Sequence, residues 1–497
     1  MTRPFDFDLA VIGGGAAGLS VAAGAARLGV RTLLVEKEPA LGGDCLHHGC
    51  VPSKTLLKTA RVRRLMARAR DFGLPAVALP PVDFTAVAGR IRHVIQAIQV
   101  HDSPERFRSL GAEVIFGPAA FVDEHTLDVA CRRYSAARLV LATGSSAAIP
   151  ALPGLESVPF LTNRELFRLD RLPASLVILG AGPMAMEMAQ AFFRLGSHVT
   201  VIQRGGQILS KEDPDMAQMA MDALLLESAQ GLPGAGTLDI RLGVTVAAVR
   251  LGQTRNGNSG DTEGVAVDVR DASGAISTIH AERLLVALGR APNVAGLDLG
   301  KAGVAFTAKG VTVDSRLRTS QPHIFAAGDV TGAFPFTHAA GYEAGVVVSN
   351  AVFRLPRKAD YRLLPWCTYT EPELASIGLN ETRAAAQGVA YRVWSEEFRA
   401  NDRAQTEGET TGRLKLLVDR RGRPLGVQIL GPHAGEILNA WVVALGGTIR
   451  LATLAAATHP YPTLGEISKR VAGAVLAERL FSNTVRRTLR LLFRYRG

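Results

Sequence analysis

The sequence predicts an α/β protein of several domains, and three observations support this fold class. The chain has 497 residues, which suggests three domains at roughly 150 residues each. Its composition, 47% hydrophobic and 20% charged residues, is typical of globular proteins and argues against a disordered chain. A glycine-rich strand–turn–helix unit occurs near the N-terminus and again near residue 180. Such units are the building blocks of parallel α/β sheets.

The first unit has the complete pattern of a Rossmann-like dinucleotide-binding fold. A strand, a glycine turn, a helix and a second strand are expected in succession over residues 8–36. Gly13 permits the tight turn, Gly15 lets the backbone approach a pyrophosphate, and Gly18 lets the helix pack closely on the strand. Glu36 ends the second strand, where a carboxylate can bind the hydroxyl groups of an adenosine ribose.

The second unit repeats this pattern with two differences. The strand–helix–strand segment 175–202 contains Gly180 and Gly182, but Ala185 replaces the third glycine as a permitted small residue. The acid after the second strand is missing, and Arg204 stands near its place. An arginine there can pair with a 2′-phosphate, which favours NADPH over NADH. The alternative is an arginine that is simply solvated.

Two such units on one chain suggest one flavin site and one nicotinamide site. The N-terminal unit suits FAD, and the second unit, between turn-rich segments, is expected to be a domain inserted within the first. A short strand before Asp329 could return to the first domain and direct this carboxylate at a ribityl hydroxyl of the flavin. We therefore predict an FAD-binding domain over residues 1–150 and 286–357, and an NAD(P)-binding domain over residues 151–285.

Two cysteines, Cys45 and Cys50, lie directly after the first unit. They are too few for a zinc site, which needs four ligands. Two thiols that can close into a disulfide beside a flavin would form a two-electron relay. Cys50 is expected at the start of a helix, where the helix dipole favours its thiolate. The alternative is a pair of inert buried cysteines, and the surrounding glycines and proline argue against it.

The segment around these cysteines resembles a known active-site signature. Residues 45–54, Cys-Leu-His-His-Gly-Cys-Val-Pro-Ser-Lys, are similar to that of the pyridine nucleotide–disulfide oxidoreductases, which include dihydrolipoamide dehydrogenase, glutathione reductase and mercuric reductase. The resemblance covers roughly residues 5–480, including the segments 142–144 and 287–290. It implies FAD, a nicotinamide donor and a homodimer, with residues 358–480 as a dimerisation domain of α+β type.

The resemblance also implies roles for individual residues. The reduced flavin would open a Cys45–Cys50 disulfide, with Cys50 next to the flavin and Cys45 as the interchange thiol. Lys54 is similar to a lysine near flavin N5, and Glu187 to its ion-pair partner. Glu187 could instead be an ordinary acid on a helix surface. Further cofactor contacts are implied for Gly43, Thr143, Gly144, Gly289 and Arg290.

The C-terminal segment separates the members of this family. Members that handle dithiols place a His-Pro-Thr-x-x-Glu stretch in the partner subunit's active site, with the histidine as acid and base. Counting back from Glu466, that position holds Tyr461, as in mercuric reductase. A phenol with an ordinary pKa of about 10 is a poor base at neutral pH. His459, two residues away, could replace it only with a changed backbone path.

We therefore expect a mercuric reductase-like enzyme in which Cys45 and Cys50 are transient linear ligands of a soft metal substrate. Residues 101–107 also look like mercuric reductase-type proteins. A disulfide reductase similar to dihydrolipoamide dehydrogenase is the alternative, and a membrane-docked electron carrier or redox sensor is a third hypothesis.

Some features depart from mercuric reductases. The sequence shows neither their C-terminal cysteine pair nor their N-terminal metal-binding domain. His47 and His48 occupy positions that are small or apolar in relatives, where they could ligate metal or move protons, and simple packing is an equally weighted alternative. Cys131 and Cys367 are expected to be buried and inert.

The net charge is +11, and part of this excess is local to residues 481–497. This tail has no acidic residue, and leucine and phenylalanine side chains alternate with five arginines: Arg486, Arg487, Arg490, Arg494 and Arg496. We expect an amphipathic tail that contacts anionic membrane, with a solvated basic end as the alternative. No recognisable nucleic-acid motif supports a nucleic-acid partner.

The sequence contains no apolar run of about 20 residues that would span a membrane. Asp6 and Asp8 precede the apolar N-terminal stretch, where a signal peptide would carry positive charge. The expected localisation is therefore the cytoplasm, with peripheral membrane contact through the tail as an option.

Overall fold

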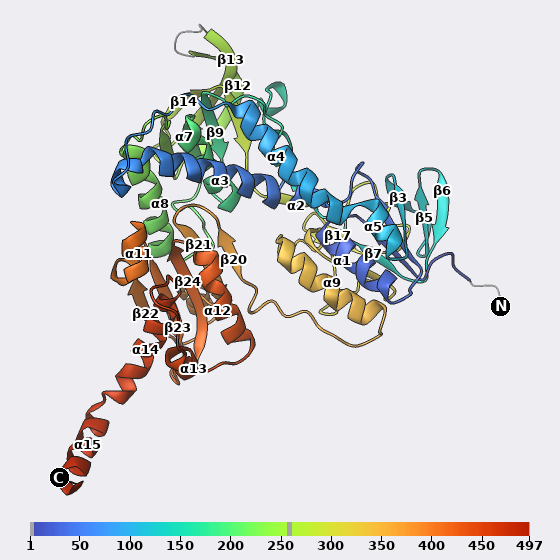
Figure 1. Cartoon of the computed structure of the whole chain (residues 1–497). Helices are drawn as coiled ribbons and strands as arrows, with labels where there is room; N and C mark the ends of the chain where they lie inside the picture. The colour runs from blue at the N-terminus through green and yellow to red at the C-terminus, as the bar shows by residue number, and fades with distance from the viewer. Residues whose placement is uncertain (1–3, 256–260, 497) are drawn as a thin grey trace. The chain divides into compact units, whose positions relative to one another are not determined.

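The structure, a computed structural model shown in Figure 1, describes residues 4–255 and 261–496. The chain divides into two compact units, called unit 1 and unit 2 below. Unit 1 comprises residues 1–180, 191–202 and 233–360, and unit 2 comprises residues 181–190, 203–232 and 361–497.

The first glycine turn belongs to a five-stranded parallel sheet in unit 1. The strand order is β19-β7-β1-β2-β3, so the segment before Asp329 does return to the first sheet, where β19 pairs with β7. The bounds are β1 Leu9–Ile12, β2 Thr32–Glu36, β3 Ala112–Phe116, β7 Leu139–Leu141 and β19 Ile324–Ala326. Strands β1, β2, β7 and β19 are buried along their whole length, as expected when both faces of a parallel sheet are covered.

The two faces of this sheet belong to different cores because side chains alternate along a strand. On one face, Leu9 and Val11 pack with helices α1 (Ala16–Arg27) and α9 (Thr337–Ala351), which lie side by side in Figure 1. On the other face, Ala10 packs with a three-stranded antiparallel sheet. The strands of that sheet are β4 Ala119–Phe121, β5 Thr126–Val129 and β6 Arg132–Ser135.

The second glycine turn follows a strand of another sheet in unit 1, ordered β11-β10-β9-β15, in which β9 pairs in parallel with both β10 and β15. A three-stranded antiparallel sheet, β12-β13-β14, shares a core with it through residues such as Val177 and Val265. The bounds are β9 Ser175–Leu179, β10 His198–Gln203, β11 Leu238–Leu242, β12 Thr245–Arg255, β13 Asp261–Arg270, β14 Ile276–Ala281 and β15 Arg283–Val286.

Unit 2 is built on a five-stranded antiparallel sheet of order β20-β21-β24-β23-β22. Its strands are β20 Trp366–Thr368, β21 Glu373–Gly378, β22 Arg392–Glu397, β23 Arg413–Val418 and β24 Pro424–Gly431. Helices α12 (Ala434–Gly446) and α14 (Glu466–Leu480) share its core, where the fully buried Trp441 donates a hydrogen bond to Ser468 Oγ at 3.0 Å. This bond satisfies the one polar atom of the largest core side chain.

Further helices and strands complete the two units. The remaining helices are α2 Gly43–His47, α3 Cys50–Ala67, α4 Phe84–Gln99, α5 Pro104–Ser109, α6 Asn163–Leu166, α7 Pro183–Leu195, α8 Pro214–Ala229, α10 Glu381–Ala386, α11 Asp402–Glu407, α13 Leu451–Ala456 and α15 Asn483–Arg496. The remaining strands are β8 Ser145–Ala147, β16 Arg290–Pro292, β17 Phe306–Thr307 and β18 Gly310–Val311.

The predicted fold class, two Rossmann-like sheets followed by an α+β domain, is confirmed. The domain boundaries predicted at residues 150, 285 and 357 stay predictions. None of the described helices combines the length and apolar character that a membrane-spanning segment needs.

One expectation about a cysteine is wrong. Cys131 is exposed, because it occupies the tight turn between β5 and β6, where Ala130 and Cys131 both have positive φ angles. A two-residue hairpin turn projects from the sheet and cannot bury its side chains in a core. Cys367 is half-buried rather than buried.

Candidate redox active site

Cys45 and Cys50 lie on two consecutive helices of unit 1, and both are in the reduced thiol form. Cys45, in α2, is half-buried, whereas Cys50 is exposed and is the first residue of the 18-residue helix α3. The position of Cys50 agrees with the sequence prediction. The N-terminal end of a helix carries a partial positive charge, so it favours a thiolate at this residue.

The electrostatics of the pair make the two thiols unequal. A hydrogen bond with Cys50, then burial, then the charge of Cys50 raise the pKa of Cys45 above that of an ordinary thiol. Two adjacent thiols cannot both ionise easily, because the second negative charge would face the first. With Cys50 at the helix N-terminus, the first thiolate is expected there and the second proton stays on Cys45.

A threonine that sequence analysis missed completes the pair. Thr337 is the first residue of α9, and its Oγ1 lies 3.4 Å from Cys50 Sγ. A hydrogen bond from Thr337 also lowers the pKa of Cys45, although other influences outweigh it. Its hydroxyl is therefore placed to stabilise negative charge on either sulfur. The only sequence signal was a helix start eight residues after Asp329, which is too weak to assign a role.

The first glycine turn fits the pyrophosphate of FAD. A Cβ on Gly13, whose φ is +109°, would lie 2.3 Å from the carbonyl oxygen of Ala142, and one on Gly18 would lie 1.8 Å from the Gly13 oxygen. Gly15 is the N-cap of α1, so the helix begins with small residues and open N–H groups. An anion can approach such a helix end closely.

The redox segment packs directly against this turn. A Cβ on Gly43 would lie 2.7 Å from the Cα of Gly15, so these two glycines allow the backbones to touch. Glu36 is buried beside them, and its carboxylate accepts hydrogen bonds from the N–H groups of Gly14 at 2.6 Å and Glu38 at 2.8 Å. The carboxylate predicted to bind ribose is thus held at the turn.

A carboxylate–arginine network joins the redox segment to the end of β19. Arg290 forms ion pairs with Asp44, the residue before Cys45, at 2.9 Å and with Asp329 at 3.6 Å. Arg290 also donates to the hydroxyl of Ser145 at 2.7 Å, and that hydroxyl donates to Asp329 Oδ2 at 2.5 Å. Burial raises the pKa of Asp329.

Asn163 completes this network by donating to Asp44 Oδ1 at 3.0 Å and to the carbonyl oxygen of His48 at 3.0 Å. Of the other residues predicted to contact a cofactor, Thr143 donates from Oγ1 to the Asn293 carbonyl at 2.7 Å. The adjacent Gly144 has a φ of +69°, and Gly289, which precedes Arg290, has a φ of +122°. Their cofactor roles stay predictions.

The second glycine turn fits a nucleotide for a related reason. A Cβ on Gly180, whose φ is +98°, would lie 2.6 Å from the Ala287 oxygen, whereas one on Gly182 would meet nothing within 4 Å among the described residues. The glycine at 182 is therefore not required by packing, and it leaves space for a ligand. Ala185 is buried, and Arg204 is exposed in the turn after β10.

Lys54 lies one helical turn after Cys50 in α3, in unit 1. Glu187 belongs to unit 2, where it is buried and accepts a hydrogen bond from the Tyr369 N–H at 2.9 Å. The alternative of a surface acid at Glu187 is therefore wrong. The ion pair between Lys54 and Glu187 stays a prediction.

The C-terminal segment of unit 2 carries the predicted acid–base position. Tyr461 is 70% exposed and donates from its phenol to Asp402 Oδ2 at 2.7 Å. This hydrogen bond and the charge of Asp402 raise the pKa of Tyr461. Glu466 begins α14 and accepts from the Thr463 N–H at 3.4 Å, and His459 Nδ1 lies 3.1 Å from the carbonyl oxygen of Ala457.

Of the two histidines of the redox segment, His47 has a hydrogen-bond partner, whereas the buried Nδ1 of His48 has none among the described residues. His47 Nε2 lies 2.9 Å from the Leu41 carbonyl oxygen. Burial lowers the pKa of His48, and the charge of Asp44 opposes that shift. The contact of His47 favours the packing interpretation for that residue, and for His48 both interpretations stay predictions.

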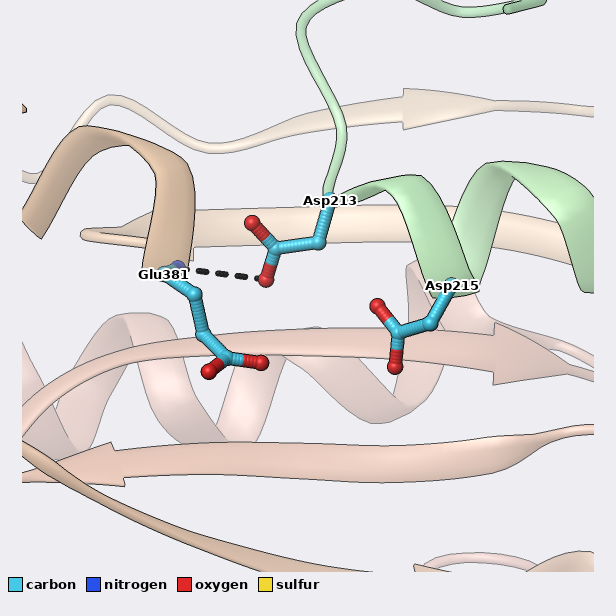
Figure 2. Close-up of side chains that lie close together, drawn as sticks. All are labelled: Asp213, Asp215 and Glu381. Atoms are coloured by element: carbon cyan, nitrogen blue, oxygen red, sulfur yellow. Dashed lines mark hydrogen bonds between the residues drawn. The ribbon is translucent and has the colours of Figure 1, made fainter. Parts of the chain in front are cut away.

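Asp213, Asp215 and Glu381 bring three carboxylates together in unit 2, as Figure 2 shows. The Nζ of Lys415 lies among them, 2.8 Å from Asp213, 2.7 Å from Asp215 and 2.9 Å from Glu381, and this side chain is only 2% exposed. The cation of this cluster is therefore the ammonium of the protein itself. Burial would raise the pKa of Asp213, but hydrogen bonds from Lys415 and backbone amides outweigh it and lower the pKa.

Comparisons with known proteins agree with this architecture. Residues 7–344 match the family described as pyridine nucleotide-disulphide oxidoreductase, and residues 364–472 match its dimerisation domain. A mercuric reductase of Streptomyces lividans is 32% identical over 94% of this chain and 95% of its own length. A dihydrolipoyl dehydrogenase of Bacillus subtilis (strain 168) is 31% identical over 92% of this chain and 96% of its own.

A solved structure is also similar over almost the whole chain. It is the Cu(II) complex of the HOCl-induced flavoprotein disulfide reductase RclA from Escherichia coli, with 26% identity and a TM-score of 0.80. The similarity covers 96% of this chain and 100% of that structure.

Proposed function

Because the chain belongs to the pyridine nucleotide-disulphide oxidoreductases, we propose that it is a mercuric reductase-like enzyme that passes electrons from NADPH to a soft metal ion or a related thiol-reactive substrate. Family membership establishes oxidoreductase activity with FAD and NAD(P)H as cofactors, and the dimerisation domain supports a homodimer. The substrate, the choice of NADPH and the residue roles are the proposal.

The observation that carries the proposal is the state of Tyr461. Asp402 accepts a hydrogen bond from the phenol of Tyr461 and raises the pKa of that phenol, so the phenol stays protonated at neutral pH and cannot act as a base. Disulfide exchange with a dithiol needs such a base, as the family resemblance implies. Reduction of a metal ion held by two thiolates does not need one.

The sulfur pair supplies the chemistry that this substrate needs. Bound FAD would carry two electrons from the nicotinamide to the sulfur atoms of Cys45 and Cys50. Cys45 and Cys50 would bind a soft dication as two thiolate ligands, a coordination that soft metals prefer. Binding of the ion would displace the proton of Cys45. When two electrons reduce the ion to the metal, both metal–sulfur bonds would break, and Cys45 would take up a proton again while Cys50 stays a thiolate. In the net reaction, NADPH is oxidised to NADP⁺ and one proton is released.

The placement of Arg204 supports NADPH as the donor. Its side chain is exposed in the bend after β10, in sequence at the position where an acid would bind the 2′-hydroxyl group. Changing Arg204 to Ala is expected to raise KM for NADPH more than for NADH. An equal loss for both would show that Arg204 does not read the 2′-phosphate.

The test is steady-state NADPH oxidation by purified holoenzyme with Hg(II), Cu(II), lipoamide and glutathione disulfide. We expect Hg(II) to turn over fastest, and Cys45→Ser and Cys50→Ser each to lose activity by about a thousandfold or more. Cys131→Ser, which removes an exposed thiol from a hairpin turn, is the matched control and should keep full activity. Faster turnover of lipoamide than of Hg(II) would contradict the proposal.

A disulfide reductase is the second candidate, because the dihydrolipoyl dehydrogenase of Bacillus subtilis is nearly as similar as the mercuric reductases. Tyr461→His separates the two. If Tyr461 blocks the acid–base step, this substitution raises lipoamide reduction and leaves Hg(II) reduction unchanged. Fast lipoamide reduction that survives His459→Ala in an enzyme with Tyr461 would favour the second candidate.

A further inference from the structure

Helix α15 (Asn483–Arg496) carries none of the residues assigned above to the redox chemistry. It begins 11 residues after the last residue of the matched dimerisation domain, Ala472. Within unit 2, Figure 1 shows it leading away from the antiparallel sheet. Packing in the core of unit 2 therefore does not explain why α15 alternates apolar and basic residues.

One face of α15 is apolar and exposed. Val485, Leu489, Leu492 and Phe493 follow the i, i+4, i+7, i+8 spacing that places side chains on one face of a helix. Leu489 is 45% exposed, Leu492 50% and Phe493 77%. A water-exposed stripe of large side chains indicates a surface that is covered by a partner.

The opposite face of α15 is basic. It carries Arg486, Arg487, Arg490 and Arg494, again at positions that share one side of the helix. The structure gives none of these four guanidinium groups an ion-pair partner among the described residues, and residues 481–497 contain no aspartate or glutamate.

From this arrangement we propose that α15 docks the enzyme on an anionic lipid bilayer. A helix with leucine and phenylalanine on one face and arginine on the other lies in the membrane interface, where the apolar face enters the acyl region and the guanidinium groups bind phosphates. Arginine stems are long enough to reach the headgroups from the side of the helix. With 14 residues, α15 is too short to span a bilayer and must lie along its surface.

A second copy of this chain suits α15 less well. Each copy carries a net charge of +11, and its tail contributes five arginines without an acid, so two tails in contact would repel each other. An anionic lipid surface removes this repulsion. Salt screens the electrostatic attraction between the arginines and the anionic headgroups, so binding should weaken as the salt concentration rises.

The test is flotation of the full-length holoenzyme with vesicles of phosphatidylcholine alone or with one quarter phosphatidylglycerol. We expect binding to the anionic vesicles only, and release at 0.5 M NaCl. Arg487→Gln with Arg490→Gln should weaken binding about fivefold per arginine. Leu489→Gln with Phe493→Gln should also release the enzyme. NADPH oxidation should be unchanged in both variants.

The matched control is Arg399→Gln with Arg420→Gln, which changes the net charge equally at exposed sites elsewhere in unit 2. It should bind like the unmodified enzyme. Absence of binding to anionic vesicles, or equal binding to both kinds of vesicle, would overturn the proposal. So would a loss in the control as large as that in the α15 variants. Self-association that Leu489→Gln abolishes, without vesicle binding, would assign the apolar face to a second copy instead.

Discussion

Two clusters of this protein each combine carboxylates with one basic side chain, but their surroundings differ. In unit 2, Lys415 is surrounded by three acids and is almost completely buried. In unit 1, Arg290 pairs with Asp44 and Asp329 while remaining about one quarter exposed. The first cluster surrounds the buried ammonium of Lys415, whereas the second contains Asp44, the residue before the Cys45 thiol. The comparison teaches that chemistry and accessibility, rather than the number of acids, mark the functional cluster.

Lys415→Met is expected to have the largest effect on stability. Removing the ammonium leaves three carboxylates together without their cation, which should cost about 3–5 kcal/mol. Thermal unfolding of this variant, with exposed Lys309→Met as the control, measures the loss. A loss under about 1 kcal/mol would show that the cluster is solvated in solution.

The pH dependence of the Lys415 cluster follows from its pKa shifts. The pKa of Asp213 is lowered, so its stabilisation is complete above its ordinary value and is lost as the pH falls through the lowered one. The pKa of Lys415 is raised, so its contribution is lost only as the pH rises above its ordinary range. The unmodified protein should therefore lose this stabilisation in strong acid. Lys415→Met should instead gain stability as the pH falls from 7 to 5, because the crowded carboxylates then take up protons.

Asp44→Asn tests the cluster beside the thiols and should have an intermediate effect on stability. It keeps the shape of the side chain but removes the charge that pairs with Arg290, which should cost about 1–2 kcal/mol. Turnover should also fall, because Asp44 positions the segment that carries Cys45. Asp215→Asn is the matched substitution in the other cluster, and it should change stability without changing turnover. Equal effects of both substitutions on turnover would contradict the claim that only the Asp44 cluster is functional.

Thr337→Val should have the smallest effect on stability but a clear effect on the thiols. The hydrogen bond from Thr337 lowers the pKa of Cys45, so its loss should raise that pKa. The Thr337 hydroxyl also lies 3.4 Å from Cys50 Sγ, where the first thiolate is expected. The pH profile of thiol alkylation should therefore shift to higher pH. Thr337→Ser restores the hydroxyl and should restore the profile. An unchanged profile in Thr337→Val would mean that the hydroxyl does not act on the sulfur pair.

Several features of the site were predicted well because they depend on neighbours in sequence. The turn with Gly13 and Gly18 leaves no room for a Cβ, so the glycines at those positions indicate a tight turn from the sequence alone. Cys50 at a helix start follows from the residues around it. Tyr461 was predicted to be a poor base, and Asp402 strengthens that prediction from a helix far away in the sequence.

Other features had no local signal. The contact of Thr337 with Cys50 joins residues 287 positions apart, and Asp44 meets Arg290 only because β16 follows the inserted sheet. Cys131 was expected to be buried, as free cysteines usually are, but a hairpin turn exposes it. His47 had two interpretations until its contact with the Leu41 carbonyl oxygen was known, and His48 still has both.

The sequence alone determined the two nucleotide turns, the sulfur pair and the amphipathic tail, because spacing along a strand or helix sets which side chains share a turn or a face. The tertiary structure decided which charges surround the thiols, which acid holds the Tyr461 phenol, and that Lys415 rather than a metal sits among three carboxylates. These outcomes depend on distances between residues remote in the chain, and only the packing of sheets and helices brings such residues within a few ångströms.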